Sequence, residues 1–485
     1  MNKKKGYFIP TGMNQKNGYF IPTGMNRKQG YFIPIVMLLA VVVFAVTTAI
    51  LSLAYMNMRT VKRQVNSATA LNISEAGINY YLWHLSHNNT DYCDGQACVG
   101  SGPYGPYVHE YKDTSGVVVG KYTLTITPPI SGGTTATVRS EGEKTATGEK
   151  RTIISTLGMP SFSEYSYVSD YEVWFGSAES TQGLVHSNRG VHYDGTAAGV
   201  VSSTASSYIP TTCFGGDGHT SQNGVWGNGG PKSYWQFPVP KVDFSLISAN
   251  LQDLRTKSLE TGGLHIPNSN KYGYKLVLNG NNTVTISTVK KANNDGSQNN
   301  GCISSPGYNS LINEVINPVT YNLPSNGVIF VDDNVWVSGT LNSRLTIATG
   351  QFPEKASTYT KMFLQDNIIY SAYDGSVALG LIAQSDIVIN SSSANNLEID
   401  GYLMSQYGNI FRPYYSGNIK NHIKIYGGIA PNKSWTWNWV SGNTVTSGYR
   451  TTEQVYDNNL ALRPPPEFPT TGSFAILSWK EEPIL

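Results

Sequence analysis

The stretch IVMLLAVVVFAVTTAILSLA, from Ile35 to Ala54, decides the fold because it is 20 residues long and nearly all apolar. No charged residue occurs between Tyr31 and Met58. A helix of this length spans roughly 30 Å, the thickness of the hydrocarbon core of a bilayer. We reject a buried core helix, because no soluble core needs so long an uncharged run. We therefore predict a membrane-spanning helix, whose anchoring residues include Ile35, Leu38, Val42, Phe44 and Ile50.

The charges around this stretch predict its orientation. The first 30 residues carry six basic groups and no acid, and Arg59, Lys62 and Arg63 follow the stretch. The positive-inside rule places the N-terminus in the cytoplasm and the rest of the chain outside. We therefore expect a single-pass protein of the inner or cytoplasmic membrane, with an extracytoplasmic ectodomain.

A processing signal precedes the apolar stretch. A secretory signal peptide is cleaved after its apolar core, but here Arg27-Lys28-Gln29-Gly30 stands directly before Tyr31 and the apolar run. This arrangement resembles a prepilin leader, which implies that prepilin peptidase cleaves after Gly30 and leaves Tyr31 as the mature N-terminus. Residues 1–30 contain a 12-residue repeat that starts again at Met13 and Met25. We interpret this basic segment as a duplicated leader.

The chain after the membrane stretch also resembles pilins. Apolar residues continue at helical spacing to about residue 88, and Ser74-Glu-Ala-Gly-Ile-Asn-Tyr-Tyr81 is similar to the corresponding segment of PilX-type minor pilins. This predicts one pilin-like helix over 31–88. Major pilins carry Glu at the fifth mature position, where this chain has Ile35. The resemblance therefore implies a tip or initiating subunit rather than a shaft subunit.

Four cysteines allow three disulfide pairings. An exported domain is in a compartment that permits disulfides, and the spacing is not that of a zinc site. We favour the pairs Cys93–Cys98 and Cys213–Cys302.

The ectodomain is predicted to be mainly β. Residues 89–160 contain β-branched runs that predict a small antiparallel sheet packed on the helix. Residues 161–326 are rich in Gly, Ser and Asn, and include a helix over 243–260 with Ile247, Leu251 and Leu254 on one face. Short apolar runs joined by turns over 327–460 predict a parallel β-helix, with a β-sandwich as the alternative. Segments of this region, and the Pro-rich tail at 461–485, are similar to PilX-like proteins.

Candidate chemical sites are few. The adjacent Asp332 and Asp333 are the weak candidates for a metal, although adjacent residues of a strand point to opposite faces and a turn is the simpler interpretation. Asp386 with Asp400 is another carboxylate pair. His186, His192 and Asp194 suggest a metal or acid–base group, for which a hydrogen-bonded turn is the alternative; Asp217 and His219 are interpreted in the same way. No catalytic motif with its proper context occurs, so we predict no enzyme, no metal and no cofactor.

Composition agrees with a surface protein. Charged residues make up 14% of the chain and the formal net charge is +2, which does not support nucleic-acid binding. The resemblance implies a structural minor pilin of a type IV pilus or pseudopilus, displaying a β-rich head for assembly or adhesion. Its expected partners are prepilin peptidase, other pilin helices, the membrane and surface glycans. The alternative is a membrane-anchored β-helix protein that binds or acts on polysaccharide.

Overall fold

The computed structural model describes residues 32–129, 135–303, 305–442, 444–470 and 474–483. The predicted processing residues Gly30 and Tyr31 lie outside this range. The chain divides into two compact units between Asn66 and Ser67.

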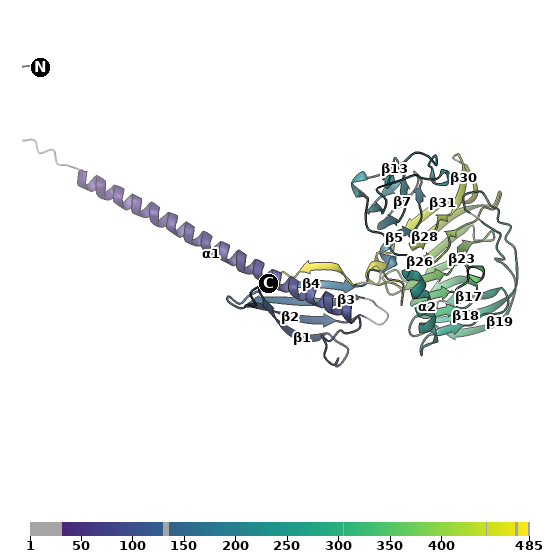
Figure 1. Cartoon of the computed structure of the whole chain (residues 1–485), viewed down its shortest axis with the longest axis horizontal. Helices are drawn as coiled ribbons and strands as arrows, with labels where there is room; N and C mark the ends of the chain where they lie inside the picture. The colour runs from purple at the N-terminus through teal and green to yellow at the C-terminus, as the bar shows by residue number, and fades with distance from the viewer. Residues whose placement is uncertain (1–31, 130–134, 304, 443, 471–473, 484–485) are drawn as a thin grey trace, which may run out of the picture. The chain divides into compact units, whose positions relative to one another are not determined.

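Helix α1 runs from Phe32 to His87 (Figure 1). Every side chain from 32 to 65 is exposed. The apolar run at 35–54 has no separate polar face, so apolar side chains surround the helix there. Among the residues that the structure describes, α1 is the one helix long and apolar enough to cross a membrane. The predicted helix over 31–88 therefore agrees with the structure to within one residue at each end.

An antiparallel sheet of five strands packs on the second half of α1 (Figure 1). Its core consists of alternate strand residues, such as Leu124, Val138 and Ile153, against Ile73 and Ile78 of the helix. The strands, in spatial order, are β1 (Tyr104–Lys112), β2 (Val118–Thr127), β3 (Thr135–Lys144), β4 (Glu149–Gly158) and β32 (Ala475–Glu481).

Small residues bring the helix and the sheet into close contact. A Cβ on Gly142 of β3 would lie 2.3 Å from the carbonyl oxygen of Ala70, and one on Gly77 would lie 2.3 Å from the hydroxyl of Ser140. The Ser74 hydroxyl donates to the carbonyl of Ser140 at 2.6 Å, and accepts from the N–H of Ile153 at 3.1 Å. The Ser74–Gly77 motif therefore forms the helix–sheet contact.

Stacked parallel strands form a β-helix rather than a sandwich, and they extend from residue 165 to residue 455, whereas we expected them over 327–460 only. One ladder begins with β16 (Leu264–Ile266), β20 (Val328–Val331), β22 (Arg344–Thr349), β24 (Ala378–Ala383), β26 (Asn396–Ser405) and β28 (Ile419–Pro431). After β28 it continues with β5 (Tyr165–Ser169), β8 (Leu184–Ser187), β11 (Val201–Ser203) and β15 (Trp235–Gln236).

Further ladders complete the coils. The second contains β17 (Gly273–Asn279), β21 (Val335–Leu341), β23 (Met362–Tyr370), β25 (Ile387–Ile389), β27 (Ile410–Phe411) and β29 (Trp435–Thr436). The third contains β6 (Val173–Phe175), β9 (Val191–Tyr193) and β14 (Val225–Trp226). Shorter or peripheral pairings involve β7 (Ser180–Thr181), β10 (Thr196–Ala197), β12 (Ser207–Tyr208), β13 (Gln222–Asn223), β18 (Thr283–Asn293), β19 (Leu311–Asn322), β30 (Asn438–Ser441) and β31 (Thr444–Val455).

The order of the coils differs from the order of the chain. Strand β5, in the Gly-rich region, pairs with β28, near the end of the β-helix, through Tyr167 and Ile429. The regions 161–326 and 327–460, which we predicted separately, therefore share one ladder. Strands β5, β8, β11 and β15 of the first region are only two to five residues long, so their hydrophobic pattern is too brief to recognise.

Helix α2 (Leu246–Leu259) covers one face of this ladder. Its residues Ile247, Leu251 and Leu254, the predicted apolar face, pack in a buried cluster with Val328 and Phe330 of β20. The prediction of a helix at 243–260 is confirmed, with ends that differ by one to three residues.

Candidate functional site

The anchoring half of α1 presents apolar side chains without a protein cover. The predicted anchoring residues are 51–71% exposed, and comprise Ile35, Leu38, Val42, Phe44 and Ile50. A contiguous apolar surface of this size marks contact with a membrane or with other proteins. A span without charge also avoids the cost of placing an ionised side chain in hydrocarbon.

Both predicted disulfides are present. Cys93 and Cys98 close a short loop, and Cys213 joins Cys302 across 89 residues of chain. The second bond links two loops that emerge from different coils, so it restrains chain segments that short strands hold only weakly. No free cysteine occurs among the described residues.

The predicted histidine group separates into two structural sites. His192 lies between two indole rings, with its ring centroid 5.1 Å from that of Trp174 and 3.8 Å from that of Trp226. Its Nε2 lies 3.1 Å from the carboxylate of Asp194, which also accepts from the Trp174 indole N–H. His186 contacts Ser202 and Asn188 instead, at 3.0 Å each. These contacts assign both histidines to the stacking of coils.

The carboxylates that we singled out are engaged in the fold. Asp332 accepts two hydrogen bonds from the Arg255 guanidinium, at 2.8 and 2.9 Å, and lies 2.9 Å from His265 Nε2. Asp333 accepts from the backbone and hydroxyl of Ser269. Both lie in the turn between β20 and β21, so their oxygens are already used to hold α2 and neighbouring loops.

Asp386 and Asp400 also have separate surroundings. Asp386 accepts from the Tyr308 hydroxyl at 3.1 Å and from the Asn409 N–H at 2.8 Å, whereas Asp400 accepts from the Tyr370 N–H at 2.7 Å. Burial raises the pKa of Asp400. At Asp217, hydrogen bonds from Thr220 and the His219 N–H lower the pKa to about 2, as a turn-capping carboxylate requires. Among the described residues, no group of three or more His, Cys, Asp or Glu is arranged to hold a metal.

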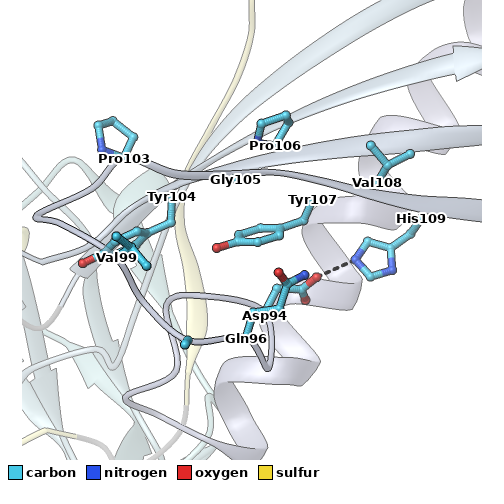
Figure 2. A pocket seen from close by; sticks show the side chains of 11 residues that line it. Asp94, Gln96, Val99, Pro103, Tyr104, Gly105, Pro106, Tyr107, Val108 and His109 are labelled. Carbon is cyan, nitrogen blue, oxygen red and sulfur yellow. Dashed lines mark hydrogen bonds and ion pairs between the residues drawn. The ribbon is translucent and has the colours of Figure 1, made fainter.

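A pocket of about 520 Å³ lies between the Cys93–Cys98 loop and strand β1 (Figure 2). Figure 2 shows Tyr107 projecting into it, with Asp94 bonded to His109 behind. The residues that line it are Asp94, Gln96, Ala97, Val99, Pro103, Tyr104, Gly105, Pro106, Tyr107, Val108 and His109.

The electrostatics of the pocket centre on Asp94. Its carboxylate lies 2.7 Å from His109 Nε2 and accepts from the Tyr80 hydroxyl at 3.0 Å, and its side chain is 4% exposed. The rings of Tyr80 and Tyr122 flank that of His109, with centroids 4.6 and 5.2 Å away. Burial and the hydrogen bond to Asp94 raise the pKa of Tyr80 to about 12. Helix α1 and strand β2 therefore fix the floor of the pocket.

This pocket is not among the sites predicted from the sequence. The available signal was the tandem triplet Gly-Pro-Tyr at 102–104 and 105–107, directly after the Cys93–Cys98 loop. Such a repeat of turn-forming residues and aromatics predicts a rigid loop that presents rings.

Comparison with known proteins gives limited information. No protein-family model matches the chain, and no curated protein matches its sequence. Among solved structures, the competence-associated pilin ComZ from Thermus thermophilus is similar at 13% identity and a TM-score of 0.29, covering 86% of this chain and 98% of that chain. The chain's own features are more informative, because a long apolar helix packed on an antiparallel sheet is the pilin-like arrangement that the prepilin resemblance implies.

Proposed function

We propose that this chain is a minor pilin-like structural subunit of a type IV pilus or related pseudopilus. The observation that carries the proposal is the division of α1. Its first half is uncharged from Phe32 to Met58 and fully exposed, whereas its second half is packed on the sheet through Ile73 and Ile78. One helix thus joins a membrane anchor to a folded head.

The exposed half of the helix requires a cover. Burying an apolar side chain of the size of Leu or Phe contributes about 1.5–3 kcal/mol, so Leu38 and Phe44 are costly to leave in water. Lipid covers them before assembly, and the helices of other pilin subunits cover them afterwards. This chain has Ile35 at the position where major pilins carry a Glu that pairs with a neighbouring subunit. Without that charge, a position at the tip of the filament is favoured over one in its shaft.

The head that follows supports a role in display. A parallel β-helix presents a large surface, and the chemical groups that we examined in it serve the fold. We therefore propose that the head is exposed on the cell surface, either within a filament or at its tip, where it contributes to assembly or adhesion.

Mass spectrometry of the mature N-terminus tests the proposal. The chain should be isolated from membranes with and without prepilin peptidase, and a peptide that begins at Tyr31 should appear only with the enzyme. The repeated leader offers matched controls: Gly30→Leu should abolish cleavage, whereas Gly18→Leu and Gly6→Leu should leave it unchanged. An intact leader in the presence of the peptidase would refute the proposal and favour a permanently anchored β-helix protein.

Assembly is a separate measurement. Surface filaments sheared from cells should contain the cleaved chain at a low ratio to the major subunit, and Gly30→Leu should remove it from that fraction. Equal amounts of the wild type and of Gly30→Leu in the sheared fraction would contradict incorporation through the processed helix.

A further inference from the structure

The pocket beside strand β1 contains hydrogen-bonding groups that the fold does not use. The Tyr107 hydroxyl and the Gln96 side-chain amide have no hydrogen-bond partner among the residues that the structure describes. Figure 2 shows the Tyr107 hydroxyl directed into the pocket, toward the side chains of Val99 and Tyr104. Burial, with a contribution from Asp94, raises the pKa of Tyr107. The hydroxyl therefore stays protonated and can donate.

The charges around the pocket favour a neutral ligand. None of the lining residues is Lys or Arg, and the lining histidine, His109, is already paired with Asp94, so the pocket offers an anion no free ion-pairing partner. The one carboxylate, Asp94, is already paired with His109 and hydrogen-bonded to Tyr80. A cation would therefore compete with an existing partner for a nearly buried group. What the pocket offers is aromatic surface, an amide and a hydroxyl.

The shape of the strand disfavours an extended peptide. Strand β1 is an edge of the sheet, because among the described strands it pairs with β2 alone. An added strand needs a continuous row of backbone donors, yet Pro103 and Pro106 have no N–H. The register also shifts between Tyr104 and Tyr107, as at a β-bulge, which is a recognised way to block pairing at an edge. The pocket thus suits a compact ligand.

We propose that this pocket binds a neutral saccharide unit of a surface glycan. Its volume of about 520 Å³ falls within the range of small-molecule sites. The rings of Tyr104 and Tyr107 supply apolar surface for the C–H face of a pyranose, and tyrosine joins such surface to a polar tip. Gln96 and the Tyr107 hydroxyl hydrogen-bond its hydroxyl groups. This site does not depend on the pilin-like function proposed above.

Saturation-transfer difference NMR on the full chain tests the inference. The chain should be held in lipid nanodiscs, because maltoside and glucoside detergents are themselves ligands of the proposed class. The probes are glucose, galactose, mannose and N-acetylglucosamine, with their β-1,4-linked disaccharides, each titrated to about 50 mM. We expect saturable binding of at least one of these probes.

Variants assign the binding to the pocket. Tyr107→Phe and Gln96→Ala each remove one hydrogen bond and should weaken binding about fivefold. Val99→Trp should abolish it, since Val99 is 86% exposed and a larger ring there fills the mouth without disturbing the core. Tyr321→Phe is the matched control, because Tyr321 is 37% exposed on β19 and does not line the pocket. Its affinity should equal that of the wild type.

The outcomes separate clearly. Saturable binding that falls in Tyr107→Phe and Gln96→Ala and disappears in Val99→Trp supports the inference, provided that the circular dichroism and melting temperature of each variant match the wild type. Binding that none of the three variants changes would place the saccharide elsewhere and overturn it. The absence of binding by every probe, or binding by sialic acid or a basic peptide in place of the neutral probes, would overturn it as well.

Discussion

Gly142→Ala is expected to weaken the contact between α1 and the sheet. The added Cβ would lie 2.3 Å from the carbonyl oxygen of Ala70 and 2.4 Å from the backbone nitrogen of Ser74. Both atoms belong to the helix backbone, so no side chain can turn away. The helix must retreat by about 1 Å to restore ordinary contact, and overpacking of this kind costs about 1–3 kcal/mol.

The retreat also lengthens a specific pair of hydrogen bonds. The Ser74 hydroxyl bridges the Ser140 carbonyl and the Ile153 N–H, and both bonds cross the contact that the new methyl group opens. We therefore expect a loss of about 2 kcal/mol, which corresponds to roughly 30-fold faster hydrogen exchange where exchange follows local opening.

Hydrogen exchange with mass spectrometry measures this loss in peptides that cover residues 118–158. Gly176→Ala is the control, since nothing lies within 4 Å of the position of its Cβ; its own peptides should exchange at the wild-type rate or more slowly. If the amides of the sheet in Gly142→Ala exchange within threefold of the wild type, the close helix–sheet contact is not a constraint and the reasoning fails.

Three further predictions concern the disulfides, a salt bridge and a partly buried acid. Cys213→Ser opens a loop that spans 89 residues, so it should lower the free energy of unfolding in urea by about 4–5 kcal/mol. Cys93→Ser opens a loop whose cysteines are separated by 5 residues, and should lower it by about 2 kcal/mol. Equal losses in the two variants would contradict loop entropy as the cause. Asp332→Asn weakens the paired hydrogen bonds from Arg255 and should lower the stability measured by thermal unfolding by about 1–2 kcal/mol. Neither EDTA nor Ca²⁺ should alter the melting temperature of the wild type. Destabilisation by EDTA would point to a bound metal instead. Burial raises the pKa of Glu179 to about 7. The folded chain therefore retains a proton that the unfolded chain releases, so stability falls as pH rises from about 4.5 to 7, by up to about 3 kcal/mol. Glu179→Gln should remove this slope, and an unfolding free energy that differs from the wild type by the same amount at pH 5 and pH 8 would refute the assignment.

The features that were predictable from the sequence have strong local signals. The apolar run at 35–54 exceeds what a soluble core needs, and the face of Ile247, Leu251 and Leu254 repeats at helical spacing. Four cysteines leave few pairings, and the favoured one is present. The Asp332–Asp333 pair lies in a turn, which agrees with the simpler interpretation that we gave.

The features that we missed depend on contacts between distant segments. Strand β32 occurs in a segment that we described only as a Pro-rich tail, because pairing with β4 rather than its own composition defines it. Strand β1 contains Gly105 and Pro106, which do not resemble a strand. The pocket brings Asp94 and His109 together over a floor that includes Tyr80, and no local pattern relates these three positions.

The order of the coils has a consequence for folding. Strand β5 obtains its ladder partner only when β28 arrives, more than 250 residues later, and β4 waits for β32 near the end of the chain. Until then, both strands present unpaired edges, which are sites of aggregation and proteolysis. A chain that ends before β32 leaves β4 unpaired, and one that ends before β28 leaves β5 unpaired as well. The stability of the sheet and of the β-helix therefore depends on segments that are synthesised long after the strands they cover.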